Sequence, residues 1–131
     1  MIRSIRGDNM LRSSARDKGN AFEYDVEYSL KARYPDIRAL EKRGYARGYD
    51  LISEQAHIVI ECKFHQSMTW NELVKIFETT RQRAEPNMAV VVFKTNQQPV
   101  LVFIGSRIIP FLDFFGVPFQ IRPKRSKEVS K

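Results

Sequence analysis

Two stretches, separated by one short polar segment, decide the fold: Tyr49-Asp50-Leu51 and His57-Ile58-Val59-Ile60-Glu61-Cys62-Lys63-Phe64. The second is typical of a buried β-strand, in which successive side chains point to opposite faces. One face would then be wholly apolar, while Val59, Glu61 and Lys63 share the other. The segment between the stretches, Ser53-Glu54-Gln55-Ala56, has the length and polarity of a hairpin loop. Pairing across that hairpin would bring the Asp50 carboxylate near Glu61.

The charged residues of this hairpin indicate a metal site. Two facing carboxylates repel each other unless a cation lies between them, and hard oxygen ligands suit Mg²⁺, with Mn²⁺ as a substitute. We therefore interpret Asp50 and Glu61 as metal ligands and Lys63 as the group that orients a water or steadies the phosphorus under attack. These are the parts of a phosphodiesterase. The structural alternative is an Asp in a turn and a Glu–Lys pair on a solvated edge, because a Glu-x-Lys triplet alone is common.

The same residues carry a resemblance. Asp50 followed by Glu61-Cys62-Lys63 at the end of a β run resembles the core of the PD-(D/E)XK nuclease superfamily, with Tyr49 in place of the usual proline. Upstream, Lys18-Gly19-Asn20-Ala21-Phe22-Glu23 is similar to the Lys-Gly-x-x-x-Glu opening of archaeal-type Holliday junction resolvases. The loop of residues 43–48 contains no serine, whereas those resolvases often carry one before the Asp.

The resemblance implies a fold, an activity and further site residues. The fold is a restriction-endonuclease-like α/β domain, a mixed sheet flanked by helices. The activity is that of a metal-dependent, homodimeric endonuclease that cleaves branched DNA in recombination and repair. Glu23, on the first helix, would be another acidic active-site residue, and the backbone carbonyl of Cys62 would be a third metal ligand. The Cys62 side chain lies on the apolar face, so we expect a small core residue rather than a nucleophile.

Composition limits the class of protein. The chain of 131 residues is 43% hydrophobic, which suits one domain with a real core. Lys and Arg total 22 against 15 acidic residues, a net charge of +7, and this excess favours a polyanionic partner. Nucleic acid is the first candidate; a membrane surface competes, but the sequence offers neither a spanning segment nor a long basic amphipathic helix. The single Cys and the absence of a secretion signal predict an intracellular, cytoplasmic protein. The resemblance implies a prokaryotic or viral origin. No small-molecule cofactor is expected.

Basic segments surround the predicted domain of residues 19–122. Residues 1–18 are predicted to form a flexible basic arm, and residues 123–131 a basic tail. The loop before Asp50 combines two glycines with Arg and Tyr side chains, which is typical of a phosphate-contacting segment; an ordinary solvated turn is the alternative. The residues predicted to contact DNA are Arg12, Arg16, Lys18, Arg43 and Arg47.

Helical spacing predicts a first helix from Gly19, with Phe22, Val26 and Leu30 as its buried stripe. Glu23 borders that stripe and should point towards the sheet; Glu27 is the competing acid, a second ligand or a DNA-facing neighbour. A strand is expected over residues 36–43.

The remaining elements follow from caps and apolar runs. Thr69-Trp70-Asn71-Glu72 is a capping box that predicts a second helix, which ends at Glu85-Pro86-Asn87. Residues 88–95 and 99–104 are predicted to be two strands buried on both faces. Residues 106–116 predict a short helix that either plugs the core or offers a dimer face, and residues 119–121 an edge strand.

These observations predict a single α/β domain whose site lies where the second and third strands diverge. The leading function is Mg²⁺-dependent hydrolysis of DNA, at four-way junctions if the resemblance holds. Three rivals remain: a related nuclease of linear, flap or single-stranded DNA, a basic DNA-binding protein without catalysis, and an RNA-binding or RNA-cutting module.

Overall fold

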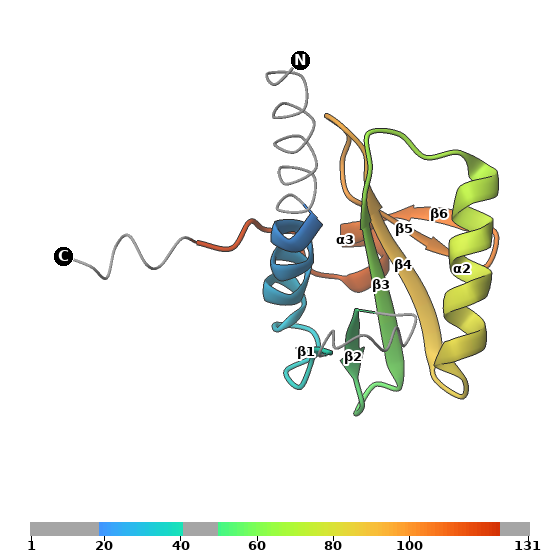
Figure 1. Ribbon diagram of the computed structural model, residues 1–131. Helices are drawn as coiled ribbons and strands as arrows, with labels where there is room; N and C mark the ends of the chain where they lie inside the picture. The colour runs from blue at the N-terminus through green and yellow to red at the C-terminus, as the bar shows by residue number, and fades with distance from the viewer. Residues whose placement is uncertain (1–18, 41–49, 124–131) are drawn as a thin grey trace, which may run out of the picture.

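A six-stranded mixed sheet forms the centre of the computed structural model, which describes residues 19–40 and 50–123 (Figure 1). Its strands lie in chain order: β1 (Arg38–Ala39), β2 (Leu51–Ser53), β3 (Ile58–Phe64), β4 (Met88–Lys94), β5 (Leu101–Ile104) and β6 (Arg107–Pro110). Neighbours pair antiparallel except β3 and β4, which run parallel over seven residues and are joined by helix α2 (Trp70–Ala84). The predicted α/β class, with helices flanking a mixed sheet, is confirmed at this level.

Helices cover both faces of the sheet. The first helix, which includes residues 19–30, lies on one face and α2 on the other (Figure 1). As predicted, Phe22, Val26 and Leu30 are buried, in a cluster with apolar side chains of β3 and β4. The stripe of α2 that packs on the opposite face consists of Leu73, Phe77, Thr80 and Ala84. Burial on both faces explains the near-continuous apolar sequence of β4.

The boundaries of α2 are those that the sequence predicts. The Thr69 hydroxyl accepts the Glu72 N–H at 3.1 Å, and the Glu72 carboxylate accepts the Thr69 N–H at 2.8 Å. This reciprocal pair satisfies two backbone donors at the start of the helix. The helix ends at Ala84, directly before Glu85-Pro86, because proline has no N–H to continue the hydrogen-bond ladder.

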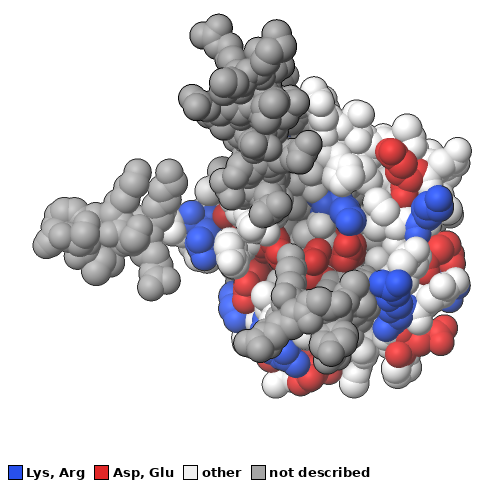
Figure 2. Space-filling view, in the orientation of Figure 1, with Lys and Arg blue, Asp and Glu red and all other residues white. Residues whose placement is uncertain are grey.

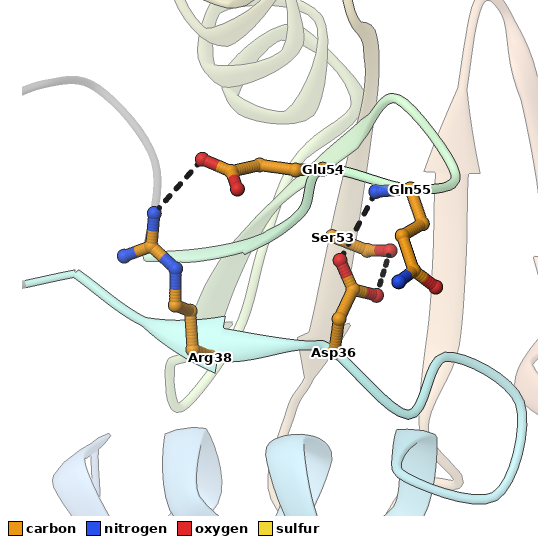
Figure 3. Close-up of polar contacts among 5 residues, drawn as sticks. All are labelled: Asp36, Arg38, Ser53, Glu54 and Gln55. Carbon is orange, nitrogen blue, oxygen red and sulfur yellow. Dashed lines mark hydrogen bonds and ion pairs between the residues drawn. The ribbon is translucent and has the colours of Figure 1, made fainter.

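A network of polar contacts fixes the β2–β3 hairpin (Figure 3). The buried Ser53 hydroxyl donates to the Asp36 carboxylate at 2.6 Å, and the Gln55 N–H donates to the other carboxylate oxygen at 3.0 Å. These two hydrogen bonds hold the pKa of Asp36 below its usual range. Arg38 and Glu54 add an exposed ion pair at 3.1 Å. The network joins the turn to the segment before β1, so it holds the register that sets Leu51 opposite Ile60.

Two predicted elements have wrong bounds. Of the strand expected over 36–43, residues 41–43 lie outside the described residues, Asp36 lies in the turn that binds Ser53, and only Arg38–Ala39 pair with β2. The helix expected over 106–116 is wrong in its first half, where Arg107–Pro110 form β6 and only Phe111–Phe115 are helical, as α3. Gly116 ends α3 with φ 78, as predicted.

The reason for the β6 error is the turn before it. Gly105 and Ser106 form a two-residue loop between β5 and β6, and Gly105 has φ 64, which glycine adopts without strain. The β-branched Ile108 and Ile109 then pair with β5. Of the 108–115 segment, Phe111 and Phe115 are buried in the core, while Ile108 and Leu112 are exposed. The segment is therefore part core and part surface.

Residues 119–121 are not the predicted edge strand. Both backbone groups of Gln120 bond instead to the Ser29 hydroxyl on the first helix, at 2.7 Å from its N–H and 3.0 Å from its carbonyl. The Phe119 ring packs 5.8 Å from Phe22, and the Arg122 N–H donates to Asp25 at 2.8 Å. These contacts bind residues 119–122 along the first helix, beside which the chain runs out in Figure 1.

Candidate functional site

Asp50 lies at the junction of three strands, immediately before β2. Its N–H donates to the Ile60 carbonyl of β3 at 2.8 Å, and its carbonyl accepts the N–H of Leu40, next to β1, at 3.0 Å. Its carboxylate accepts the Cys62 N–H at 2.8 Å. The two backbone hydrogen bonds fix the position of Asp50 between β3 and the residue next to β1, and the third hydrogen bond holds its carboxylate beside β3.

Glu61 and Lys63 share one face of β3 and form an ion pair, with 3.2 Å between Lys63 Nζ and Glu61 Oε2. The Glu61 side chain is 15% exposed and the Lys63 side chain 33%. Burial and, next, the negative charge of Asp50 raise the pKa of Glu61 to about 7, and the partly opposing contribution comes from Lys63. The two acids are thus close enough to repel each other, as the hairpin predicts.

Glu23 completes the group from the other side of the sheet. It is buried on the first helix, with 8% exposure, and its charge adds to the rise in the pKa of Glu61. The neighbouring Phe22 ring lies 5.8 Å from that of Phe64, at the end of β3, which anchors this turn of the helix near the site. The competing acid Glu27 is half-buried one turn further along. The structure therefore brings Asp50, Glu61 and Lys63 together at β3 and places Glu23 near enough for its charge to act on Glu61.

Comparisons of this chain with protein-family models, with curated proteins and with solved structures found no match. The functional proposal therefore depends on the geometry of Asp50, Glu61 and Lys63 and on the chemistry of their side chains.

The donor set fits a hard divalent cation. Within residues 19–40 and 50–123, no group of three or more His, Cys, Asp or Glu side chains is placed to hold a metal ion. Magnesium, however, keeps several waters and is commonly bound through only one or two carboxylates. A cation between Asp50 and Glu61 would remove the repulsion that raises the pKa of Glu61.

The Cys62 carbonyl is the third expected ligand. In a strand, residues two apart direct their backbone groups to the same neighbour. The Ile60 carbonyl accepts from Asp50, and the Cys62 N–H donates to the Asp50 carboxylate. The Cys62 carbonyl is therefore directed towards the same edge of β3 as Asp50, where it can supply an oxygen.

More than half of the Lys and Arg residues belong to the stretches that the structure does not describe. The predicted DNA contacts lie outside the described residues: Arg12, Arg16, Lys18, Arg43 and Arg47. By sequence, the undescribed stretches 1–18, 41–49 and 124–131 hold 12 of the 22 Lys and Arg but only 4 of the 15 acidic residues. Acidic and basic side chains are interspersed on the body itself, with acidic atoms gathered near the middle of the face in Figure 2 and basic atoms beside them.

Two of these basic stretches adjoin site residues in the sequence. Residues 1–18 end five residues before Glu23, and residues 41–49 end directly before Asp50. Lys94, at the end of β4, places its ammonium 5.4 Å from the centre of the Phe64 ring.

No helix in the described part of the chain is long and apolar enough to cross a membrane.

Proposed function

We propose that this chain is a Mg²⁺-dependent endonuclease that hydrolyses DNA phosphodiester bonds, with four-way branched DNA as its substrate. The observation that carries the proposal is the convergence of the Asp50 and Glu61 carboxylates at one edge of β3, with the Lys63 amine 3.2 Å from Glu61. Charged groups are costly to bury on a largely buried strand, and two acids with an amine match the chemistry of phosphoryl transfer.

Asp50, Glu61 and the Cys62 carbonyl are the groups that would hold the metal ion. When bound, a divalent cation lowers the pKa of a coordinated water and neutralises charge that develops on the phosphate. The chain's own groups position these parts. The Cys62 N–H fixes the Asp50 carboxylate, and Glu23 adds an acid from the first helix. Lys63, which pairs with Glu61, would orient the attacking water or stabilise the developing negative charge.

The fold family, the branched substrate and the homodimer are proposed from the resemblance to PD-(D/E)XK nucleases. A six-stranded mixed sheet with helices on both faces and an acid pair at β3 is what a restriction-endonuclease-like fold would present. The resemblance to Holliday junction resolvases supplies the branched substrate and the homodimer. Exposed Leu112, in the segment predicted either to plug the core or to offer a dimer face, is available to a second copy. Light scattering at working concentration should give the mass of two chains, and a monomer would exclude the dimer.

A basic DNA-binding protein without catalysis is the second candidate, and the net charge of +7 favours it. Substitutions in the site separate the two functions. We expect Asp50→Asn, Glu61→Gln and Lys63→Met each to lower the Mg²⁺-dependent cleavage rate about 100-fold or more, because each removes a group that acts on the reacting phosphate. Binding to uncleaved DNA in EDTA should stay within about threefold of the wild type, since no basic arm is altered.

The matched control is Glu54→Gln, which removes an acid from the same hairpin whose side chain is 69% exposed. Its cleavage rate should equal that of the wild type. If the wild type cleaves no DNA in Mg²⁺ or Mn²⁺, the second candidate, DNA binding without catalysis, would be the function.

The substrate is tested by a direct comparison. Four-way, flap, nicked, linear duplex and single-stranded DNA of matched length, and an RNA equivalent, are incubated under one set of conditions. Faster cleavage of the four-way junction supports the resolvase assignment; equal rates on every DNA would reduce the proposal to a structure-independent nuclease, and preference for RNA would move it to the third rival.

A further inference from the structure

Trp70 has an aromatic ring that packs against the core on one side and is exposed to solvent on the other. Its side chain is 49% exposed although it begins the well-capped helix α2. The ring packs edge-to-face on the fully buried Phe103, with 5.3 Å between centroids and an interplanar angle of 68°. Phe103 is in turn held by Phe77 at 5.8 Å. A large ring fixed in this way can bind a flat partner with little further loss of conformational entropy.

The register of the sheet places this ring on the same face as the acid pair. Glu61 pairs with Val91 on β4, and Val91 pairs with Phe103 on β5. Val91 and Phe103 belong to the core cluster beneath α2, as does Val59, two residues before Glu61. Adjacent strands lie about 4.8 Å apart, so Phe103, and Trp70 above it, is about 10 Å across the sheet from Glu61.

Polar groups lie where the parallel strands β3 and β4 end, next to Glu61 and Lys63. The loop between β3 and α2 exposes His65, Gln66 and Ser67, and the turn between β4 and β5 exposes residues 96–98. The two loops are joined, because the Asn96 N–H donates to the Gln66 carbonyl at 3.5 Å and the His65 N–H to the Lys94 carbonyl at 3.1 Å. These neutral donors and acceptors, with Lys94, suit the sugars and phosphates of a nucleic-acid strand.

We propose that Trp70 stacks against an unpaired nucleobase of the strand whose phosphate lies at Asp50 and Glu61. The inference rests on the proposed function and adds a second subsite to it. A nucleotide combines a charged phosphate with a flat base. This face of the sheet offers the charged Glu61 and Lys63 on β3 and, two strands away, the Trp70 ring packed on Phe103 of β5. Every base has a face that can stack, so the subsite tolerates any sequence.

The subsite selects substrates by structure. A base in an intact duplex is already stacked and paired, and removing it from the stack is unfavourable, whereas junction centres, flaps and single strands offer unstacked bases. Trp70 therefore favours cleavage near an unpaired base.

A second copy of the chain is the competing occupant of this surface. Ile108 pairs with Phe103 and is exposed on the same face, so the apolar surface extends to β6. The edge of β6 is poorly suited to another strand, because it is only four residues long and ends in Pro110, which has no N–H to donate. The nucleobase is the occupant that the nearby charged pair and polar loops favour.

Trp70 is the only tryptophan among the 131 residues, so its fluorescence reports on this subsite alone. The full-length protein in EDTA, which prevents metal-dependent cleavage, is titrated with a single-stranded oligonucleotide and with a blunt duplex of equal length. We expect the single strand to quench Trp70 emission strongly at saturation and the duplex to quench it much less. Equal quenching by the two, or none at saturating single strand, overturns the proposal. A blue shift that follows protein concentration without nucleic acid would assign the surface to a second copy and also overturn it.

Variants measure the energetics through the anisotropy of a labelled single strand. Trp70→Ala should weaken binding about tenfold, and Trp70→Phe, which keeps an aromatic face and the packing on Phe103, should restore most of it. Tyr28→Ala is the matched control, because Tyr28 is 41% exposed but belongs to the first helix, which lies on the opposite face of the sheet from α2 (Figure 1). Its affinity should match the wild type. Equal affinities of Trp70→Ala and the wild type, with Trp70→Ala shown to be folded by circular dichroism, contradict the stacking.

An abasic site moved along the strand locates the stacked base. At one position near the cleaved phosphate, the wild type and Trp70→Ala should bind equally, because the partner of Trp70 is gone. A Trp70-dependent loss that persists at every abasic position would overturn stacking. Quenching by a single strand without cleavage in Mg²⁺ would refute the nuclease while keeping the subsite; cleavage without quenching would refute only the subsite.

Discussion

The charge of Glu61 should oppose folding in the absence of metal. The folded protein raises the pKa of this group from 4.5 to about 7, so the folded state binds its proton more tightly than the unfolded state does. Well below pH 4.5 both states are protonated and no penalty exists; well above pH 7 both are ionised and the penalty is complete. The rise of about 2.5 pKa units corresponds to about 3.5 kcal/mol at most, from about 1.4 kcal/mol for each pKa unit. Stability of the metal-free protein should therefore fall as the pH rises through this window.

Glu61→Gln isolates the effect, because the amide keeps the size of the side chain and removes its charge. At pH 8 in EDTA, we expect the variant to unfold with a free energy about 1 to 3 kcal/mol higher than that of the wild type. The lower end of the range allows for the Glu61–Lys63 ion pair, which is lost in the variant. At pH 4.5 the two proteins should be equally stable. Urea denaturation followed by circular dichroism, from pH 4.5 to 8.5, gives the difference at each pH.

Magnesium should reverse the order. Millimolar Mg²⁺ should stabilise the wild type at pH 8 and leave Glu61→Gln nearly unchanged, because a ligand that binds only the folded state shifts the equilibrium towards it. Glu54→Gln, which alters an exposed acid, should show no pH-dependent difference from the wild type in EDTA. A Glu61→Gln protein less stable than the wild type at pH 8, or a stability difference that is constant from pH 4.5 to 8.5, would refute the reasoning.

Three further perturbations test the scaffold and the arms. Asp36→Asn should lower stability at neutral pH because it weakens the bonds to Ser53 and Gln55; since the pKa of Asp36 is lowered, this contribution is present above pH 3.8 and lost on acidification, so urea curves of the two proteins should converge at low pH. Ser29→Ala should destabilise the protein by about 1 to 2 kcal/mol, measured by the same denaturation, because both backbone groups of Gln120 lose a partner. Deleting residues 124–131, which contain four Lys and Arg, should reduce the slope of log K for DNA against log salt by up to about 3 to 4, and an unchanged slope would exclude the tail from binding.

The hairpin that carries the site could be predicted from sequence because its determinants are local. An apolar β run, a polar turn of fixed length and an Asp just before the partner strand specify the register between them. Asp50 and Glu61 then have to lie near each other in any sheet that pairs these strands. The burial of Glu23 was predictable from its helical spacing relative to Val26 and Leu30.

Other features depended on contacts distant in sequence or on turn chemistry. The β5–β6 hairpin has a local signal, Gly105-Ser106 between two apolar runs, and the rich apolar content of residues 108–115 obscured it. Residues 119–121 have strand composition, but their backbone partner is a serine on a helix 91 residues away, which no local pattern reveals. In the sequence, Trp70 belongs to a capping box, which indicates only the start of a helix. Its position on the sheet relative to Glu61 follows from the register of three strands.

Two carboxylates of one small region show opposite shifts in pKa, and the difference distinguishes a structural acid from a functional one. Asp36 has its pKa lowered because Ser53 and Gln55 donate hydrogen bonds to its ionised form. Glu61 has its pKa raised because burial and Asp50 oppose its charge by more than Lys63 favours it. A group retained only for stability should resemble Asp36. Glu61 differs, because its charge destabilises the folded chain and a glutamine of equal size would not. A cation bound at this site would explain why an acid stands there. Cation binding would then restore the stability that the buried charge removes.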